Sequence, residues 1–258
     1  MIQSSEVIRI TEWLQGFAKQ HHTGEASIDS NIDLKLNHSL RVAQEAKSIA
    51  KSLNLSDSDI NLAQICGILH DVGRFRQYKI YQTFVDSQSV YHGTMGVDVL
   101  NMVNVLDKFD KKTVNIIHAA VYNHGLIAIE EGLPERELLF SKITRDADKI
   151  DIYRIVTLYY HQSDNRNSAL ELGLTREEII DNAVLEDFAT GKVVEKTDLK
   201  SLNDFKVLQL SWINDINYGF TAKTIAERNF LNQIVNSIEG EENRNLIAKI
   251  LKTKLDKM

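Results

Sequence analysis

The sequence of 258 residues has a single cysteine and a single proline. With only Cys66, the chain cannot form an internal disulfide, which is typical of proteins from a reducing compartment. One proline and twelve glycines leave few positions that would break a helix. We therefore expect an all-α fold.

The sequence also lacks long apolar runs and any excess of basic residues. No stretch reaches the roughly 18 apolar residues of a membrane-spanning helix, and no signal-peptide pattern opens the chain. The formal net charge is −6, so we expect no DNA-binding surface. These absences predict a cytoplasmic protein without a membrane partner. A homodimer is possible.

Hydrophobic periodicity predicts helices along the first part of the chain. The first covers residues 4–20, and a second is expected to begin at His38 after the capping residue Asn37. A third, buried helix carries the chain into His70 and Asp71. Gly73 is interpreted as a helix stop, which makes residues 74–92 a loop over a cleft.

Further helices are expected from His92, over 113–124 and from Pro134 to 161. Residues 162–258 carry few groups capable of chemistry and are expected to form packing helices, beginning at a capping box in 175–178. No repeat or linker is evident. We expect a single domain, residues 1–258, with its core at about 30–155 and C-terminal packing helices at about 162–258.

Histidine and aspartate side chains recur at the expected helix ends and in a polar break of the 134–161 helix. Imidazole and carboxylate groups are good ligands for divalent metal ions. Carboxylates in a buried helix must be paired or coordinated, because burying a lone charge is strongly unfavourable. The candidates are His38, His70, Asp71, His92, His118, His124, Asp146 and Asp148.

The order His38, then His70-Asp71, then Asp148 resembles the signature of the HD superfamily of metal-dependent phosphohydrolases. The likeness extends over about residues 30–155, with Leu-His-Asp-Val-Gly at the doublet and Arg-Asp-Ala-Asp-Lys-Ile-Asp at the last aspartate. The stretch 73–93 is similar to a poorly characterised bacterial group of HD proteins. This resemblance implies an HD-domain helical bundle with additional C-terminal helices.

By the same resemblance, His38, His70, Asp71 and Asp148 would hold one divalent ion. His92 and His124 stand where the ligands of a second ion would fall, and His118 is the less favoured alternative to His124. Asp146 would orient a ligand histidine. The implied cofactor is one or two ions of Mn, Fe, Ni, Co, Mg or Zn.

The chemistry implied is hydrolysis of a phosphomonoester or nucleotide by metal-activated water. Asp71, Arg74 and Lys149 are the expected catalytic residues. Cations are needed for the phosphate, and the candidates are Arg74, Arg76, Arg145 and Lys149. Two alternatives stay open: a nucleotide-binding regulatory HD module without turnover, and a di-iron HD oxygenase.

Overall fold

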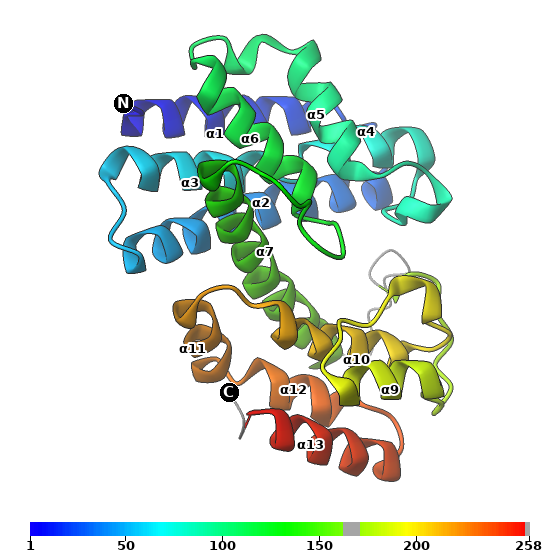
Figure 1. The fold of residues 1–258 in the computed structure, drawn as a ribbon. Coiled ribbons are helices and arrows are strands. Elements are labelled where there is room, and N and C mark those ends of the chain that lie inside the picture. The colour runs from blue at the N-terminus through cyan, green and yellow to red at the C-terminus, as the bar shows by residue number, and fades with distance from the viewer. Residues whose placement is uncertain (162–170, 256–258) are drawn as a thin grey trace. The chain divides into compact units, whose positions relative to one another are not determined.

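The computed structural model describes residues 1–161 and 171–255 (Figure 1). Within these ranges the regular structure is helical. The extended pairing found there is an isolated parallel bridge between Thr175 and Ser201. The prediction of an all-α fold is confirmed.

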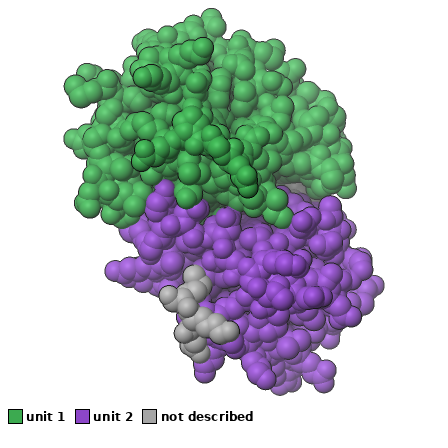
Figure 2. Space-filling view, in the orientation of Figure 1, with its two compact units in different colours: residues 1–151 green, residues 152–258 purple. Residues whose placement is uncertain are grey.

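The chain divides into two compact units, Met1–Asp151 and Ile152–Met258 (Figure 2). The division falls inside helix α7 (Glu135–His161). The expectation of one domain across residues 1–258 stays a prediction.

Helix α3, the third helix of the first unit, is buried along nearly its whole length. It packs against α2, α1 and α6, while α4 packs against α2 and α5, and α5 against α6. The apolar residues of α3 therefore form the centre of this unit. Its helices are α1 (Ser4–Lys19), α2 (Ala26–Ser52), α3 (Asp57–Leu69), α4 (Val72–Tyr81), α5 (His92–Met102), α6 (Lys111–Asn123) and the first part of α7.

The expected start of the second helix at His38 is wrong, because α2 begins at Ala26. Asn31 and Ile32 are buried and lie at helical spacing from the buried His38 and Ser39. The same buried stripe thus lies on both sides of Asn37 along the chain, so Asn37 is inside the helix and cannot cap it.

The expected helix stop at Gly73 is also wrong, since α4 covers Val72–Tyr81. Gly73 allows α4 and α5 to approach closely, because a Cβ atom there would lie 2.6 Å from the backbone nitrogen of Gly96. The predicted loop over 74–92 is therefore reduced to residues 82–91, which include a short 3₁₀ turn at Asp86–Gln88.

The second unit is built around α10, which packs against α9 and α12, and α12 packs in turn against α11 and α13. The expected helix start at 175–178 is wrong: Thr175 accepts a backbone hydrogen bond from Leu202 instead. The capping box lies at Ser201 and Asp204, at the start of α10. The helices are α9 (Asn182–Thr190), α10 (Leu202–Ser211), α11 (Gly219–Glu227), α12 (Phe230–Ser237) and α13 (Glu241–Leu255).

Cys66 is fully buried in α3, and burial raises the pKa of its thiol. In the described part of the chain, no helix combines the length and apolar character needed to cross a membrane.

The contact between α2 and α3 at Gly67 generates a stability prediction. A Cβ atom on Gly67 would lie 2.8 Å from Ala43 Cα, so Gly67→Ala forces the two helices apart. We expect the free energy of unfolding to fall by about 1–3 kcal/mol, as for overpacked cores. Urea unfolding followed by circular dichroism measures this change.

Gly16→Ala in α1 is the matched control, because a Cβ atom there would meet nothing within 4 Å. We expect this variant to gain about 0.5–1 kcal/mol, the usual preference for alanine over glycine inside a helix. Equal destabilisation in both variants would contradict the close contact at Gly67.

Candidate metal centre

Two histidines of the first unit face each other through their Nε2 atoms, which lie 3.1 Å apart. They are His38 on α2 and His70 directly after α3. Nδ1 of His38 donates to Asp151 Oδ2 at 2.7 Å, and Nδ1 of His70 donates to the Gly67 carbonyl at 2.8 Å. Because both partners only accept, the proton of each neutral ring is on Nδ1. The two Nε2 lone pairs therefore point at one another.

A second pair of histidines repeats this arrangement. Nε2 of His92, at the start of α5, lies 2.9 Å from Nε2 of His124, directly after α6. Nδ1 of His92 donates to Asp86 Oδ2 and that of His124 to the Val121 carbonyl, both at 2.7 Å. Two lone pairs again face each other, and a cation between them would turn repulsion into attraction.

The Asp71 carboxylate lies between the two pairs. Its Oδ2 is 3.6 Å from Nε2 of His38 and 3.7 Å from that of His70. Its Oδ1 is 3.7 Å from Nε2 of His92 and 3.4 Å from that of His124. Asp71 thus presents a different carboxylate oxygen to each pair of histidines.

Asp148 on α7 lies nearest to the first pair. Its Oδ1 lies 3.1 Å from Nε2 of His38 and 3.7 Å from Nε2 of His70. This atom and Asp71 Oδ1 are enclosed, and neither accepts a hydrogen bond from the described residues. Two buried anionic oxygens without donors are costly, which is the condition that a bound cation would relieve.

The pKa shifts keep the two carboxylates charged and two of the imidazoles neutral. Burial alone would raise the pKa of Asp71, but the ammonium of Lys35 and the neighbouring His70 outweigh it and hold that pKa well below its usual range. Burial is likewise outweighed at Asp148, whose pKa is lowered by His38 and His70.

Among the imidazoles, burial lowers the pKa of His70, and that of His92 to about 3. At His38 burial acts in the same direction, but the Asp148 and Asp151 carboxylates outweigh it and raise the pKa. Anionic carboxylates beside neutral imidazoles are the protonation states that divalent metals require.

The donor set fits one or two divalent ions. Ligand atoms lie within 4.8 Å of one another in three overlapping groups: His38–His70–Asp71, His70–His124–Asp148 and Asp71–His92–His124. Imidazole nitrogens combined with carboxylate oxygens suit first-row metals such as Mn, Fe, Co, Ni and Zn. The structure thus brings together six of the eight expected ligands.

Sequence reasoning missed two carboxylates that orient ligand histidines. Asp151 accepts from His38 and is itself held by Arg41, whose Nε lies 2.6 Å from its Oδ1. Asp86, in the 82–91 loop, does the same for His92. The orienting role expected of Asp146 is thus filled at His38 by Asp151, which lies one helical turn after Asp148. That spacing was the available signal.

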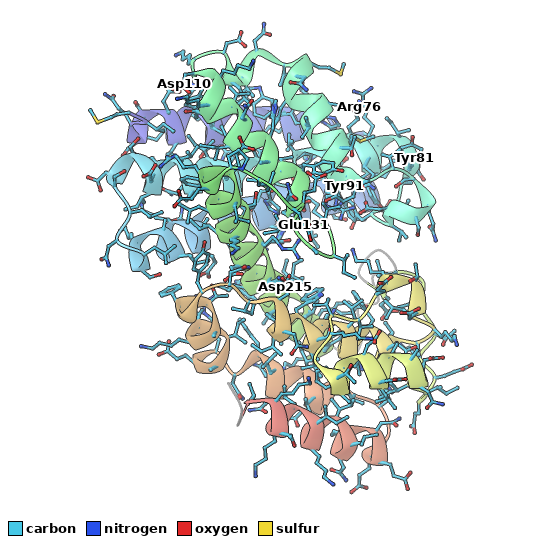
Figure 3. The ribbon with its side chains drawn as sticks, in the orientation of Figure 1. Arg76, Tyr81, Tyr91, Asp110, Glu131 and Asp215 are labelled. Carbon is cyan, nitrogen blue, oxygen red and sulfur yellow. The ribbon has the colours of Figure 1, made fainter. Side chains whose placement is uncertain are left out.

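Two of the expected phosphate-binding cations, Arg76 and Arg145, are engaged elsewhere, and Arg74 is held at the centre itself, with Nε 3.4 Å from Asp71 Oδ1. Arg74 is buried and donates to the Phe84 carbonyl at 2.7 Å and to Asp86 at 2.9 Å. Arg145 donates to four backbone carbonyls after α6, those of residues 123, 124, 126 and 127. Arg76, labelled in Figure 3, contacts Met102 Sδ.

Two lysines are close to the ligand set in space or in sequence. Lys149 is buried and directly follows Asp148 on α7. Lys35, which sequence reasoning missed, lies three residues before His38 on α2 and places Nζ 2.8 Å from Asp71 Oδ2. Its position one turn before a ligand histidine was the signal available in the sequence.

His118 is not part of the cluster. It lines a separate cavity of about 430 Å³ together with Asp98, Glu130 and Glu137. Its Nε2 is enclosed and makes no hydrogen bond among the described residues. The structure therefore places His124, rather than His118, beside Asp71.

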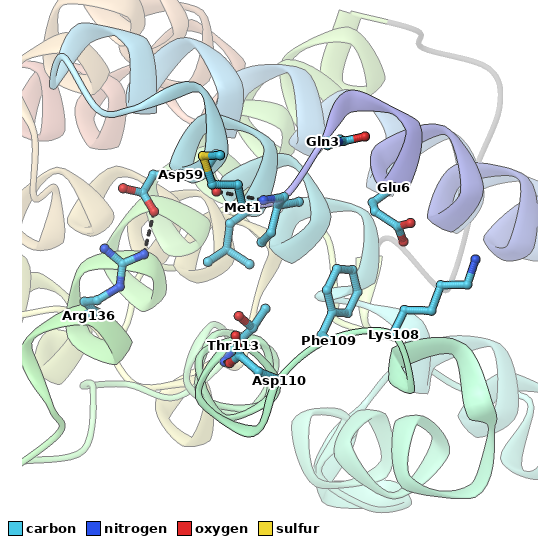
Figure 4. Close-up of a pocket in the computed structure, with 12 residues that line it drawn as sticks. Met1, Gln3, Glu6, Asp59, Lys108, Phe109, Asp110, Thr113 and Arg136 are labelled. Carbon is cyan, nitrogen blue, oxygen red and sulfur yellow. Dashed lines mark hydrogen bonds and ion pairs between the residues drawn. The ribbon is translucent and has the colours of Figure 1, made fainter.

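Another cavity of the first unit, of about 280 Å³, offers no comparable chemistry (Figure 4). Its Asp59 is paired with Arg136 at 2.5 Å, and its Asp110 caps α6 by accepting from the Thr113 amide. No histidine lines this cavity within the described part of the chain. The candidate centre is therefore the cluster around Asp71.

Comparison with known proteins agrees with this geometry. The model of the HD domain matches residues 36–153, a range that contains all the clustered histidines and aspartates. Ribonuclease Y of Mycoplasmoides gallisepticum is 31% identical over 134 residues, which are 48% of this chain and 20% of that protein. No solved structure matches. Residues 36–153 of the chain therefore form an HD domain, which confirms the resemblance to the HD superfamily.

Proposed function

We propose that the HD domain hydrolyses a phosphate ester, either a phosphomonoester or a nucleotide, at a centre of two divalent ions. His38, His70, Asp71 and Asp148 would hold one ion. Asp71, His92 and His124 would hold the other. The observation that carries the proposal is the arrangement of the four histidines. They form two pairs, one on either side of Asp71, and within each pair the Nε2 lone pairs point at each other.

When bound, divalent ions lower the pKa of a coordinated water and polarise phosphoryl oxygens. The residues of the chain supply the remaining requirements. Asp71, ionised and buried, orients the attacking water, while Asp86 and Asp151 hold two of the imidazoles in place. Lys149 is proposed as a cation for the developing negative charge on the phosphate.

Arg74 and Arg145 are proposed to act through other residues. Arg74 binds the 82–91 loop that carries Asp86, and Arg145 binds the carbonyls that follow α6, including that of His124. In this proposal they position the second pair of histidines. Arg76 lies against Met102 and is given no role.

The similarity to ribonuclease Y supports a phosphate ester as the bond that is broken. Because the chain spans a fifth of that protein's length, RNA is one member of the substrate panel and not the expected substrate. The net charge of −6 gives no support for long nucleic acids.

Replacing Asp71 by Asn tests the proposal directly. Asn keeps the shape but removes the charge shared by both halves of the centre. We expect hydrolysis of a panel of phosphomonoesters, nucleotides and a phosphodiester, supplied with Mn²⁺, to fall by about 100-fold or more. Asp110→Asn, which alters a carboxylate that caps α6 in the cavity of Figure 4, is the control and should retain activity.

Wild-type protein that binds Mn²⁺ without turning over any member of the panel would contradict the hydrolase. Tight binding of a nucleotide in that case would favour the regulatory module. Iron as the retained metal, with an optical absorption that changes under oxygen, would favour the oxygenase.

His92→Ala tests the number of ions. The change removes one ligand of the second pair while leaving His38, His70 and Asp148 intact. We expect the stoichiometry of Mn²⁺ in a calorimetric titration to fall from about two ions per chain to about one. An unchanged stoichiometry would contradict the second half of the centre.

Asp151→Asn tests the orienting carboxylate. The Asn side chain can still contact Nδ1 of His38 but no longer offers a negative charge to it or to Arg41. We expect the affinity for the first ion to fall by about 10–100-fold, the usual cost of losing such a partner. Asp33→Asn, on the exposed surface of α2, is the control, and equal affinities in the two variants would contradict the role of Asp151.

A further inference from the structure

The ammonium of Lys35 occupies a defined place at the edge of the centre. Its Nζ lies 2.8 Å from Asp71 Oδ2 and 5.2 Å from the centre of the Phe84 ring. The side chain is 15% exposed, so it connects the buried carboxylate with the surface. Lys35 is thus the cation of closest approach to Asp71 among the described residues.

The oxygen that Lys35 contacts is the one that faces the first pair of histidines. Asp71 Oδ2 lies 3.6 Å from Nε2 of His38 and 3.7 Å from Nε2 of His70. An ion held by these three residues would therefore share this oxygen with the ammonium. Two cations at one carboxylate oxygen repel each other, so each weakens the binding of the other.

Lys35 also differs from the arginines of the centre in how it is held. Arg74 and Arg145 each donate to several carbonyl or carboxylate groups. Among the described residues, the hydrogen bond of the Lys35 ammonium is to Asp71 alone. A lysine on a flexible four-carbon stem with one partner can change that partner at low cost.

We propose that Lys35 is a displaceable cation of the centre. It neutralises Asp71 before a metal ion binds, and after displacement by the ion it contacts a phosphoryl oxygen of the substrate. This inference rests on the proposed function, since it assumes that an ion and a phosphate enter the same centre. It adds Lys35 to Lys149 as a phosphate contact, in place of the three arginines that the sequence had suggested.

Lys35→Met, which keeps the stem and removes the charge, should change two affinities in opposite directions. Calorimetry should show Mn²⁺ binding about tenfold tighter, because the competing ammonium is gone. Inorganic phosphate should bind the Mn²⁺-loaded protein about tenfold more weakly, because a charge-assisted hydrogen bond is lost. Lys35→Arg should restore phosphate binding, and Lys35→Gln serves as a second neutral variant should the methionine perturb folding.

Lys51→Met, on the exposed end of the same helix, is the matched control and should change neither affinity. Weaker Mn²⁺ binding in both neutral Lys35 variants would mark a merely structural role and overturn the inference. Unchanged phosphate affinity in these variants would overturn it as well.

The outcomes separate this inference from the hydrolase. Opposite shifts of the two affinities, together with no turnover of any phosphate ester by the wild type, would support Lys35 and contradict the hydrolase. Normal turnover by the wild type with unchanged affinities and KM in the Lys35 variants would contradict the role of Lys35 alone. A wild type that binds no divalent ion would contradict both.

Discussion

The first unit depends on the burial of the Asp71 carboxylate between two pairs of imidazoles. Asp71 is 3% exposed and has an enclosed oxygen without a hydrogen-bond donor. Removing a carboxylate from water is expensive unless cations or donors replace the lost hydration. The nearby cationic and imidazole groups come from α2, α3, α4, α5 and α6, so the solvation of one charge requires the helices to converge.

The two halves of the centre are supported differently. His38 is fixed from α7 through Asp151, inside a bundle of long helices. His92 is fixed by Asp86, which belongs to a ten-residue connection, 82–91, secured by Arg74 and Gln77. Loops open at lower free-energy cost than helices packed in a core. The half around His92 is therefore the one whose geometry depends on the state of a loop.

Much of this centre could be predicted from the sequence because ligands occur at fixed places in a recognisable order. His70-Asp71 and Asp148 were identified in that way, and the resemblance placed His92 and His124 where the ligands of a second ion would fall. The start of α2 and the course of α4 were mispredicted for a physical reason. Gly73 and Asn37 have local preferences that tertiary packing overrides, and the close approach of α4 to α5 is not visible in one sequence.

The roles of the cations could not be read from the sequence either. Arg74 and Arg145 are close in sequence to candidate ligands, which suggested phosphate binding, but they donate to carbonyl and carboxylate groups of the chain. Lys35 and Asp86 are also close in sequence to candidate ligands, but their contacts with Asp71 and His92 are visible only in the fold. Proximity along the chain identifies ligands more reliably than it identifies the partners that surround them.

His70 and His124 share a local feature with a wider consequence. Each is the first residue after a helix, and each donates Nδ1 to the carbonyl three residues earlier, at Gly67 and Val121. Carbonyls in the last turn of a helix lack partners within that helix. The bond that satisfies such a carbonyl is here also the bond that fixes the tautomer of the imidazole. No additional residue is needed to orient these two side chains. Shifting either helix end by one position would remove both the bond to the last-turn carbonyl and the ring nitrogen that faces Asp71.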